Sequence, residues 1–316
     1  MRILIALLVS FFSFTVAAQS FPSKPIRLVL RAPPGGTDDL LGRLIALKMP
    51  EFIGQQVIVD YRTGAGGLVA WEHVAKSPPD GHTLLLAASG LGAIKSLRPD
   101  ATIDPWRDFA WVSQVVNYQL ALVAHPSLPA KNIKELIALA RSRPGQLSYG
   151  SSGIGATPHL SAEYFKAMAK VNIVHIPYKG AGPMYVDLMG GRVELAMSVV
   201  ASAIPHVKGG KVRALGVTGA KRVPQLPDVA TIGESIPGYE FTAYYALLVP
   251  GGTPRDIIQR HADATAKTVA TPEYRQRVID GGMEPISSTP DQMLQIAKID
   301  GAKIDKIVKT AGIKLE

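Results

Sequence analysis

Short apolar runs alternate with longer helical patterns along most of this chain of 316 residues. Most runs carry apolar, often β-branched residues at consecutive positions, which is typical of strands covered by helices on both faces. The pattern therefore predicts an α/β fold built on largely parallel sheets. The expected strands span residues 26–31, 56–61, 83–88, 110–116, 120–125, 147–152, 173–178, 193–198, 212–218 and 241–249.

Threonine–proline pairs mark the expected starts of several helices between these strands. A threonine hydroxyl can accept a hydrogen bond from the first turn of a helix, and proline suits the first helical position. Asn132 followed by Glu135 resembles a capping box ahead of another helix. The four pairs are Thr157-Pro158, Thr253-Pro254, Thr271-Pro272 and Thr289-Pro290.

Two similar segments bracket the middle of the chain. Residues 120–136 and 244–258 each contain an apolar strand, a turn with proline and a capped helix. We interpret them as crossing strands that join two α/β lobes, with domain 1 at residues 21–121 plus 246–316 and domain 2 at residues 122–245. Such a protein has a cleft between its lobes, and ligands of open α/β sheets bind beyond the carboxyl ends of strands. The alternative is one large sheet.

The first residues have the pattern of a signal peptide, which we place at residues 1–18 with cleavage near Ala18. Arg2 precedes an apolar segment at residues 3–16, which is short for a membrane span, and small residues follow it. An N-terminal membrane anchor is the alternative, but no stop-transfer charges follow. We therefore expect an exported protein without stable membrane insertion, free in the periplasm if the cell is Gram-negative.

Charge and composition narrow the classes of partner. Lys and Arg number 34 against 25 Asp and Glu, a net charge of +9, but the basic residues are scattered. Scattered basic residues favour a diffuse positive field that attracts small anions, and they give no support for nucleic-acid binding. Because the chain has no cysteine, it has no disulfide, thiolate metal site or cysteine nucleophile.

No motif in the sequence supports catalysis, a metal or a cofactor. The seven histidines include no H-x-x-x-H pair for a helical zinc site. GSSGIG at residues 150–155 lacks the spacing of a hydrolase nucleophile elbow, and GIGATP at residues 153–158 lacks the third glycine of a dinucleotide fingerprint. We therefore expect a protein that is not an enzyme, with no cofactor and no metal site.

Three glycine-rich turns precede expected helices, at residues 33–39, 62–67 and 151–159. A helix start has free N–H donors and a partial positive charge, which suit a carboxylate, and glycine lets a ligand oxygen approach the backbone. Ordinary connections between strands and helices also favour Gly, Pro and Thr, so one turn alone is weak support. Two turns in one lobe and one in the other favour an anion held across the cleft.

At these turns the sequence resembles the Bug proteins, the TctC-type extracytoplasmic solute-binding receptors of tripartite tricarboxylate transporters. The resemblance covers nearly all of the expected mature chain in the right order, and it includes VLRAPPGGTDD, DYRTGAGG, YGSSGIGATPH and IPYKGAGP. It implies a two-lobed Venus-flytrap fold of the periplasmic-binding-protein type II kind, with parallel-rich sheets and two crossing strands. It also implies a monomer that binds a small carboxylate and delivers it to the permease subunits of a tripartite transporter.

The resemblance also implies which residues hold the ligand. In such proteins, backbone groups of the first two loops hold one carboxylate, often through water, and the third loop closes over the other end. Transferred position by position, this implies ligand contacts from Gly35, Gly36, Thr37, Asp38, Ala65, Gly66, Ser89, Ser151, Thr157 and His159.

This chain departs from the family pattern at positions that carry charge. The family usually has an aromatic residue in place of Arg31, a proline in place of Leu30 and a third glycine in place of Pro34. Ser198 and Val199 stand where the family usually has Asp-Asn. Because that aspartate can face a ligand amine, its replacement argues against an amino-acid ligand and adds Ser198 to the candidate ligand contacts.

We hypothesise that Arg31 holds one end of a ligand that has two separated carboxylates or an aromatic carboxylate. Arginine offers bidentate geometry to a carboxylate. The alternatives are that Arg31 points to solvent or forms an ion pair with Asp38 or Asp39. Asp38 itself has three interpretations: a favourable charge at the helix start, a contact to a ligand-bound water, or the partner of Arg31.

Two further functions stay open at this stage. A sensor that reports ligand occupancy to a membrane histidine kinase would have the same sequence features as a transport receptor. An enzyme on the same fold is less favoured, because it requires an acid, base or metal constellation that the sequence does not contain. Tyr244 and Tyr245 lie on the second crossing strand, and either could face the cleft or pack in the core.

Overall fold

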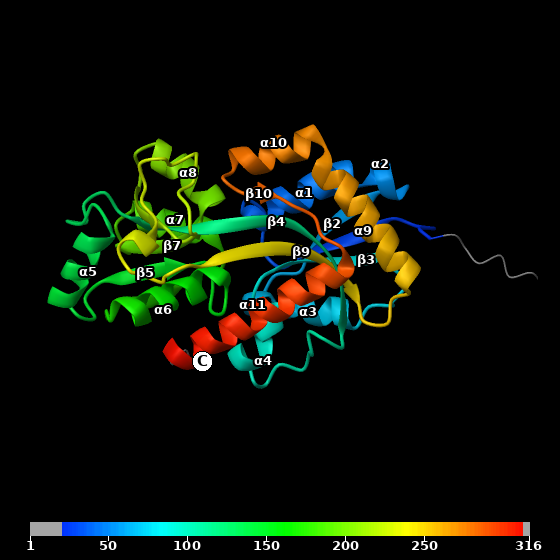
Figure 1. Cartoon of the computed structure of the whole chain (residues 1–316), viewed down its shortest axis with the longest axis horizontal. Helices are drawn as coiled ribbons and strands as arrows, with labels where there is room; N and C mark the ends of the chain where they lie inside the picture. The colour runs from blue at the N-terminus through cyan, green and yellow to red at the C-terminus, as the bar shows by residue number, and fades with distance from the viewer. Residues whose placement is uncertain (1–20, 312–316) are drawn as a thin grey trace, which may run out of the picture.

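The computed structural model describes residues 21–311, so the predicted signal peptide lies outside the described residues. Strands and helices alternate through most of this range, as the sequence predicts (Figure 1). The strands are β1 (Ile26–Leu30), β2 (Val57–Tyr61), β3 (Thr83–Ala88), β4 (Phe109–Ala124), β5 (Ser148–Ser151), β6 (Val174–Pro177), β7 (Leu195–Val199), β8 (Arg213–Val217), β9 (Thr242–Pro250) and β10 (Glu284–Pro285). The α-helices are α1 (Thr37–Lys48), α2 (Pro50–Ile53), α3 (Leu68–Ala75), α4 (Ile94–Leu97), α5 (Ile133–Ser142), α6 (Thr157–Ala169), α7 (Ala181–Met189), α8 (Val200–Lys208), α9 (Arg255–Ala270), α10 (Pro272–Asp280) and α11 (Pro290–Ala311).

The strands form two lobes that share β4. In the first lobe β1 lies parallel to β2 and β3, and β9 is antiparallel to β3. In the second lobe β5 lies parallel to β6 and β7. Hydrogen bonds nevertheless continue through β4, so the strand path runs β2-β1-β3-β9-β4-β7-β5-β6. The predicted two-lobed α/β fold is confirmed, while the residue limits of the two domains stay a prediction.

β4 is one long strand where the sequence predicts two. Its first part pairs with β9 and its last residues pair with β7 and β8. The residues between the two predicted strands alternate in burial, because Tyr118 is buried while Asn117 and Gln119 are half-buried. This alternation is typical of a strand with one more exposed face. These residues join the two predicted strands into β4, which runs from one lobe into the other (Figure 1).

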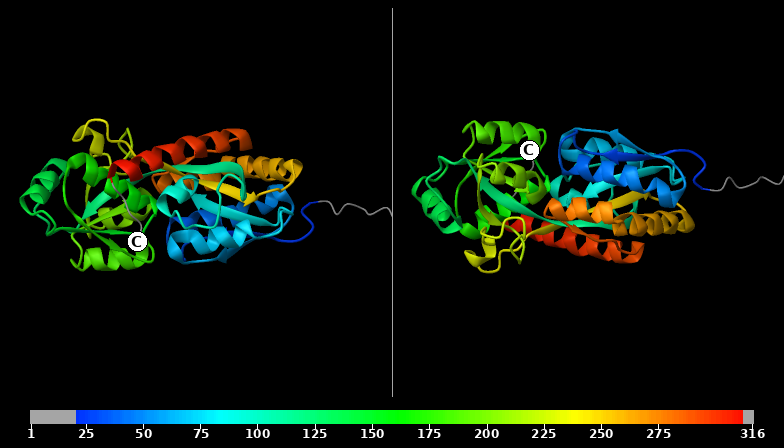
Figure 2. Two further views of the ribbon diagram at one scale, coloured as in Figure 1. Left: turned by 90° about the horizontal axis from the view of Figure 1, so that it is seen from below. Right: turned by 90° about the horizontal axis from the view of Figure 1, so that it is seen from above.

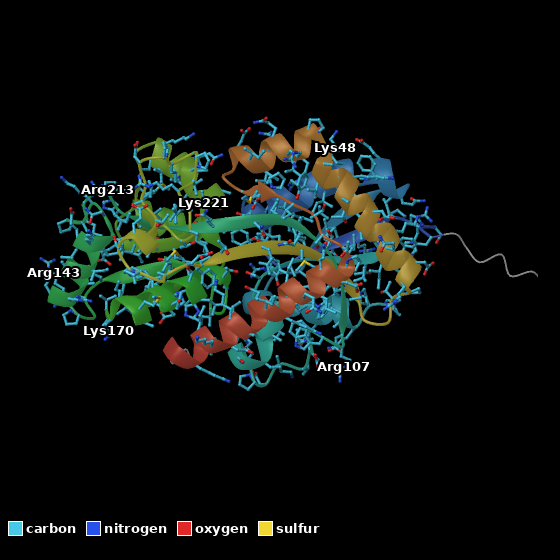
Figure 3. All side chains as sticks on the ribbon, viewed as in Figure 1. Lys48, Arg107, Arg143, Lys170, Arg213 and Lys221 are labelled. Atoms are coloured by element: carbon cyan, nitrogen blue, oxygen red, sulfur yellow. The ribbon has the colours of Figure 1, made fainter. Side chains whose placement is uncertain are left out.

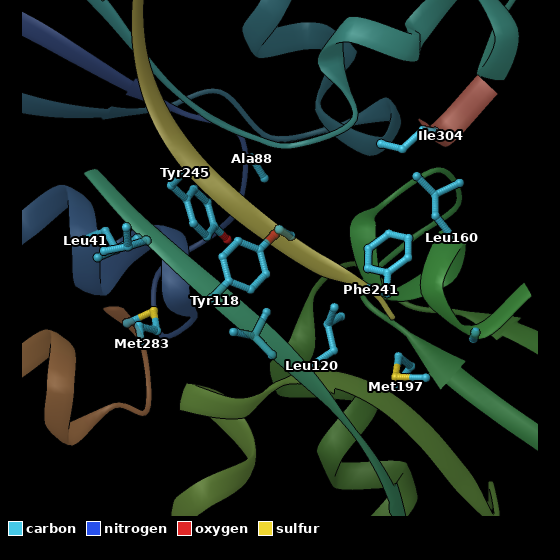
Figure 4. Close-up of a cluster of buried hydrophobic side chains, with 14 of the residues drawn as sticks. Leu41, Ala88, Tyr118, Leu120, Leu160, Met197, Phe241, Tyr245, Met283 and Ile304 are labelled. Carbon is cyan, nitrogen blue, oxygen red and sulfur yellow. The ribbon is translucent and has the colours of Figure 1, made fainter. Parts of the chain in front are cut away.

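Helices cover both faces of the first lobe. Buried side chains of α1, α9 and α10 pack on one face, and those of α3, α4 and α11 pack mainly on the other. α11 also reaches the second lobe, where Ile304 lies close to Leu160 of α6 (Figures 2 and 4). Basic side chains, including those labelled in Figure 3, lie around the periphery of both lobes. Among the described residues, no helix is long and apolar enough to cross a bilayer.

The predicted helix caps are partly confirmed. Asn132 and Thr271 cap α5 and α10, and the Thr289 hydroxyl accepts from the first turn of α11. The caps predicted at Thr157 and Thr253 are wrong. Thr157 is itself the first residue of α6 and donates to the carbonyl of Ser89, while the Thr253 hydroxyl donates to the carbonyl of Pro250.

Candidate functional site

The three predicted loops meet where the lobes contact each other. A Cβ atom placed on Gly66 of the second loop would lie 2.8 Å from the carbonyl oxygen of Ile154 in the third loop. A Cβ placed on Gly180, at the start of α7, would lie 3.6 Å from the ring of Pro33 in the first loop. The Thr37 and Ser202 hydroxyls are 3.3 Å apart and join α1 to α8. The lobes are therefore in contact along the loops.

The first loop is shaped by Asp39 in the first turn of α1. Gly35 has φ +96° and donates its N–H to the Asp39 carboxylate at 2.9 Å. Tyr61 and Arg43 donate to the same carboxylate. Burial alone would raise the pKa of Asp39, but the hydrogen bonds from Tyr61, Gly35 and Arg43 lower it overall. Asp39 therefore stays ionised and holds the backbone of the loop in place.

The second loop depends on left-handed backbone conformations. Gly64, Gly66 and Gly67 have positive φ, and so does Ala65 at φ +47°. A left-handed alanine costs about 1–2 kcal/mol, and such strain tends to persist at binding sites. The loop thus places Ala65 and Gly66, two of the predicted ligand contacts, at the edge that faces the second lobe.

Arg31 follows β1 and is buried against the start of α1. Its side chain is 12% exposed, and its Nε lies 3.3 Å from one oxygen of Asp38. The Tyr245 hydroxyl donates to the other Asp38 oxygen at 2.6 Å. Burial alone would lower the pKa of Arg31, but Asp38, Tyr245 and Tyr118 together outweigh it and raise that pKa. Of the predicted alternatives, the structure shows the ion pair with Asp38 and excludes a side chain in solvent.

Tyrosine and threonine side chains connect the Arg31–Asp38 pair to the second lobe. The rings of Tyr245 and Tyr118 lie 5.1 Å apart, between the lobes (Figure 4). The Tyr118 hydroxyl donates to the Thr157 hydroxyl at 3.2 Å, and that hydroxyl donates to the carbonyl of Ser89 at 3.2 Å. The predicted residues Ser89 and Thr157, from different lobes, are thereby brought together.

Ser151 and His159 are brought together through His175 within the second lobe. The Ser151 hydroxyl lies 2.7 Å from Nε2 of His175, whose ring stacks on His159 at 4.2 Å. The backbone N–H of Gly155 donates to His159. Burial lowers the pKa of His159 to about 4 and that of His175 to about 3, so both rings are neutral at pH 7. This arrangement supports the shape of the third loop.

Ser198 lies apart from the three loops in sequence and is buried on β7. It pairs with Ala121 of β4, and its hydroxyl lies 3.4 Å from the carbonyl of Val199. The structure therefore places a small neutral side chain in the sheet at this position. Across residues 21–311, no group of three or more acidic or histidine side chains is arranged to hold a metal ion.

The sequence did not single out Tyr118 or Trp71. Tyr118 lies in the gap between two predicted strands, and only its alternation with Asn117 and Gln119 could have indicated a strand crossing the lobes. Trp71 lies in α3 with an amphipathic pattern that predicts core packing. Its indole borders Gly67 and the side chain of Arg31, which depends on tertiary contacts that no local pattern reports.

Two α/β lobes that share a long strand, with glycine-rich loops meeting between them, define a periplasmic binding protein by fold. Within that class, the chain belongs to the TctC family, described as the tripartite tricarboxylate transporter family receptor, whose model matches residues 41–313. Similar proteins are known from several bacteria. BugT of Bordetella pertussis is 33% identical over 95% of this chain and 93% of its own length.

Solved structures are similar to this chain to about the same degree. Rpa4515 of R. palustris, solved with adipate, is 36% identical, covers 93% of this chain and 99% of its own, and has a TM-score of 0.89. MatC of Rhodopseudomonas palustris, solved with bound malate, is 28% identical, covers 91% of this chain and 100% of its own, and has a TM-score of 0.87. The ligand contacts of the present chain stay predictions.

Proposed function

We propose that this protein is a periplasmic receptor that captures a small carboxylate between its lobes and delivers it to a membrane permease. The observation that carries the proposal is the buried Arg31, which lies beside the first two loops of a TctC-family fold. Related receptors have been solved with adipate and with malate, both dicarboxylates. We favour a dicarboxylate or an aromatic carboxylate as the ligand.

The chemistry of Arg31 supports this choice. Asp38 approaches the guanidinium at Nε, whereas the two terminal nitrogens form the planar edge that matches a carboxylate. In this proposal Asp38 positions Arg31, and the terminal edge receives the ligand. The neutral Ser198 leaves no carboxylate at its position to attract a ligand amine, which supports a carboxylate rather than an amino acid.

Thermal-shift and calorimetric titrations of the protein test this proposal. Adipate, malate and benzoate form the panel, with aspartate as the amino-acid comparison. A ligand at 100 times its Kd should add about 2.7 kcal/mol of stability. Arg31→Ala should weaken the best ligand at least tenfold, since a hydrogen bond to a charged group contributes about 1.5–3 kcal/mol. Arg107→Ala is the control, because Arg107 is exposed and pairs with Asp108 away from the loops.

The outcomes separate the parts of the proposal. Binding of aspartate alone would contradict the inference that the ligand is not an amino acid, and an unchanged affinity in Arg31→Ala would remove Arg31 from the site. Recovery of the ligand unchanged after incubation is expected for a receptor, whereas turnover would indicate an enzyme. Loss of uptake of the same ligand in cells that lack only this protein tests delivery to a permease.

A further inference from the structure

Besides Nε of Arg31, several buried side chains in the described part of the first lobe have polar atoms without a hydrogen-bond partner, and three of them are donors in one region. These three donors are Nε1 of Trp71, the hydroxyl of Ser89 and the hydroxyl of Tyr244. All three residues are buried, and none of these atoms has a partner among residues 21–311. A buried donor without an acceptor costs about 1–3 kcal/mol, and native proteins rarely leave one unpaired. Several in one region therefore indicate an acceptor that does not belong to the chain.

The three donors lie on the same side of the first lobe. The backbone N–H of Ser89, the residue after β3, donates to the carbonyl of Tyr244 on β9 at 2.9 Å, so these residues are neighbours. Tyr244 and Trp71 pack in one cluster of buried residues, which also contains Ala87 and Ala246. Ala88, the last residue of β3, lies opposite Tyr245, so Ser89 lies next to Tyr244 just beyond the end of this strand pairing.

The same region borders Arg31 and the second lobe. A Cβ placed on Gly67 would lie 3.0 Å from Cδ of Arg31 and 3.2 Å from the indole of Trp71. The carbonyl of Ser89 accepts from the Thr157 hydroxyl at the start of α6. Trp71 thus lies near the buried guanidinium, and Ser89 lies at the seam at which the lobes meet, where a ligand of a two-lobed receptor binds.

One acidic side chain, that of Asp300, also affects this region. Asp300 of α11 has a buried oxygen without a partner in the described residues. Burial raises the pKa of Tyr244, and the charge of Asp300 raises it further. Burial raises the pKa of Asp300 to about 7, while Lys303 and the Gly90 amide lower it. At neutral pH a large fraction of Asp300 is therefore protonated, and in that form it is a fourth donor rather than a repelling anion.

We propose that Trp71, Ser89 and Tyr244 form a donor subsite beside Arg31 that receives carboxylate oxygens of the bound ligand. The proposal rests on the proposed carboxylate receptor and extends its site to Trp71 and Tyr244. Nε1 of Trp71 can only donate, and the hydroxyls of Ser89 and Tyr244 can each donate one hydrogen bond as well as accept. Beside the donor-only guanidinium of Arg31, these groups suit a ligand group that accepts several hydrogen bonds, as an ionised carboxylate does. The subsite therefore favours ligands rich in carboxylate oxygens.

A pair of tyrosine variants tests the subsite. Tyr244→Phe removes a hydroxyl that has no partner in the protein, so it should leave the unliganded melting temperature unchanged or raise it. The same variant should raise the Kd about tenfold or more for the panel member that binds best, whether adipate, malate or benzoate. Ser89→Ala should behave alike and provides a second variant with a very small change in volume.

Tyr274→Phe is the matched control. Tyr274 is fully buried in the same lobe, but its hydroxyl already donates to the carbonyl of Val115 at 3.2 Å. This variant should lower the melting temperature and leave the Kd unchanged, the reverse of Tyr244→Phe. A Kd within twofold of wild type in both Tyr244→Phe and Ser89→Ala overturns the subsite. A wild type that binds no panel member overturns the proposed receptor itself, so the two failures are distinguishable.

Discussion

Arg31 and Asp38 bury two opposite charges at the start of α1, with side chains that are 12% and 8% exposed. Their contact is an ion pair without an aligned hydrogen bond, because Nε of Arg31 and Oδ1 of Asp38 both lack one. Burying a pair of charges rarely stabilises a fold more than well-packed apolar residues would. The pair is therefore better explained by function than by stability, which agrees with its place between the loops.

Removing one charge of the pair should be costly. Asp38→Asn keeps an oxygen that can accept from Tyr245 but leaves Arg31 buried without its counter-charge. We expect the free energy of unfolding, measured by urea denaturation, to fall by about 3–5 kcal/mol. Glu72→Gln is the control, since Glu72 and Lys76 form an exposed pair 4.0 Å apart that contributes less than about 1 kcal/mol. Equal effects of the two variants would show that Arg31 does not need Asp38.

At the scale of elements, the loops fit each other through backbone atoms. Gly66 of the second loop approaches the carbonyl of Ile154 so closely that a side chain there requires one loop to move. Gly64 of the same loop also has positive φ, but a Cβ there would meet only the flexible side chain of Val69 at 3.1 Å. Both glycines thus have positive φ, and of the two only Gly66 approaches a backbone atom of the other lobe.

Alanine at these two positions should distinguish the effect of backbone strain on stability from the effect of the contact between the lobes on binding. Both Gly64→Ala and Gly66→Ala should lower the melting temperature, because Gly64 (φ +134°, ψ +158°) has a conformation nearly restricted to glycine and Gly66 (φ +68°, ψ +13°) is left-handed. Gly66→Ala should in addition weaken carboxylate binding severalfold more than Gly64→Ala, as measured by calorimetry. If the two variants had the same Kd, the approach to Ile154 would have no part in binding.

Elements were more predictable from the sequence than contacts between them. The strand and helix pattern follows from runs of apolar residues and from caps such as Asn132, which act over a few positions. The cap predicted at Thr157 failed because its hydroxyl donates to the carbonyl of Ser89, 68 positions away. The three loops could be anticipated from their glycine-rich turns, and the Arg31–Asp38 pair was one of the alternatives that the sequence left open. The position of Trp71 near Arg31 could not be anticipated, because it depends on how α3 packs.

At the scale of the whole molecule, net charge and ligand charge are opposite in sign. The chain carries a net charge of +9, and its labelled basic side chains are spread over both lobes (Figure 3). A positive field of this kind increases the encounter rate with small anions but adds little to the affinity once they are bound. The proposed ligand is therefore attracted from all directions before the loops select it.

The association rate of a charged ligand should depend on salt, whereas that of a neutral analogue should not. Between about 0.01 and 0.15 M salt the Debye length falls from about 30 to about 8 Å. We expect the association rate constant of adipate to fall severalfold over this range and its dissociation rate constant to change little. Stopped-flow fluorescence can measure both, because Trp71 lies beside Arg31. The neutral diamide of adipate is the comparison, and an equal salt dependence for the two compounds would contradict steering by the protein's field.

The unbroken course of β4 has a mechanical consequence. The strand passes from one lobe to the other while it remains hydrogen-bonded to β9, β7 and β8. Any separation of the loops must therefore bend and twist a paired strand, since the lobes do not rotate about a loose linker there. Opening is then an elastic deformation whose cost rises with its angle, so the resting separation of the lobes is set by the stiffness of the sheet itself.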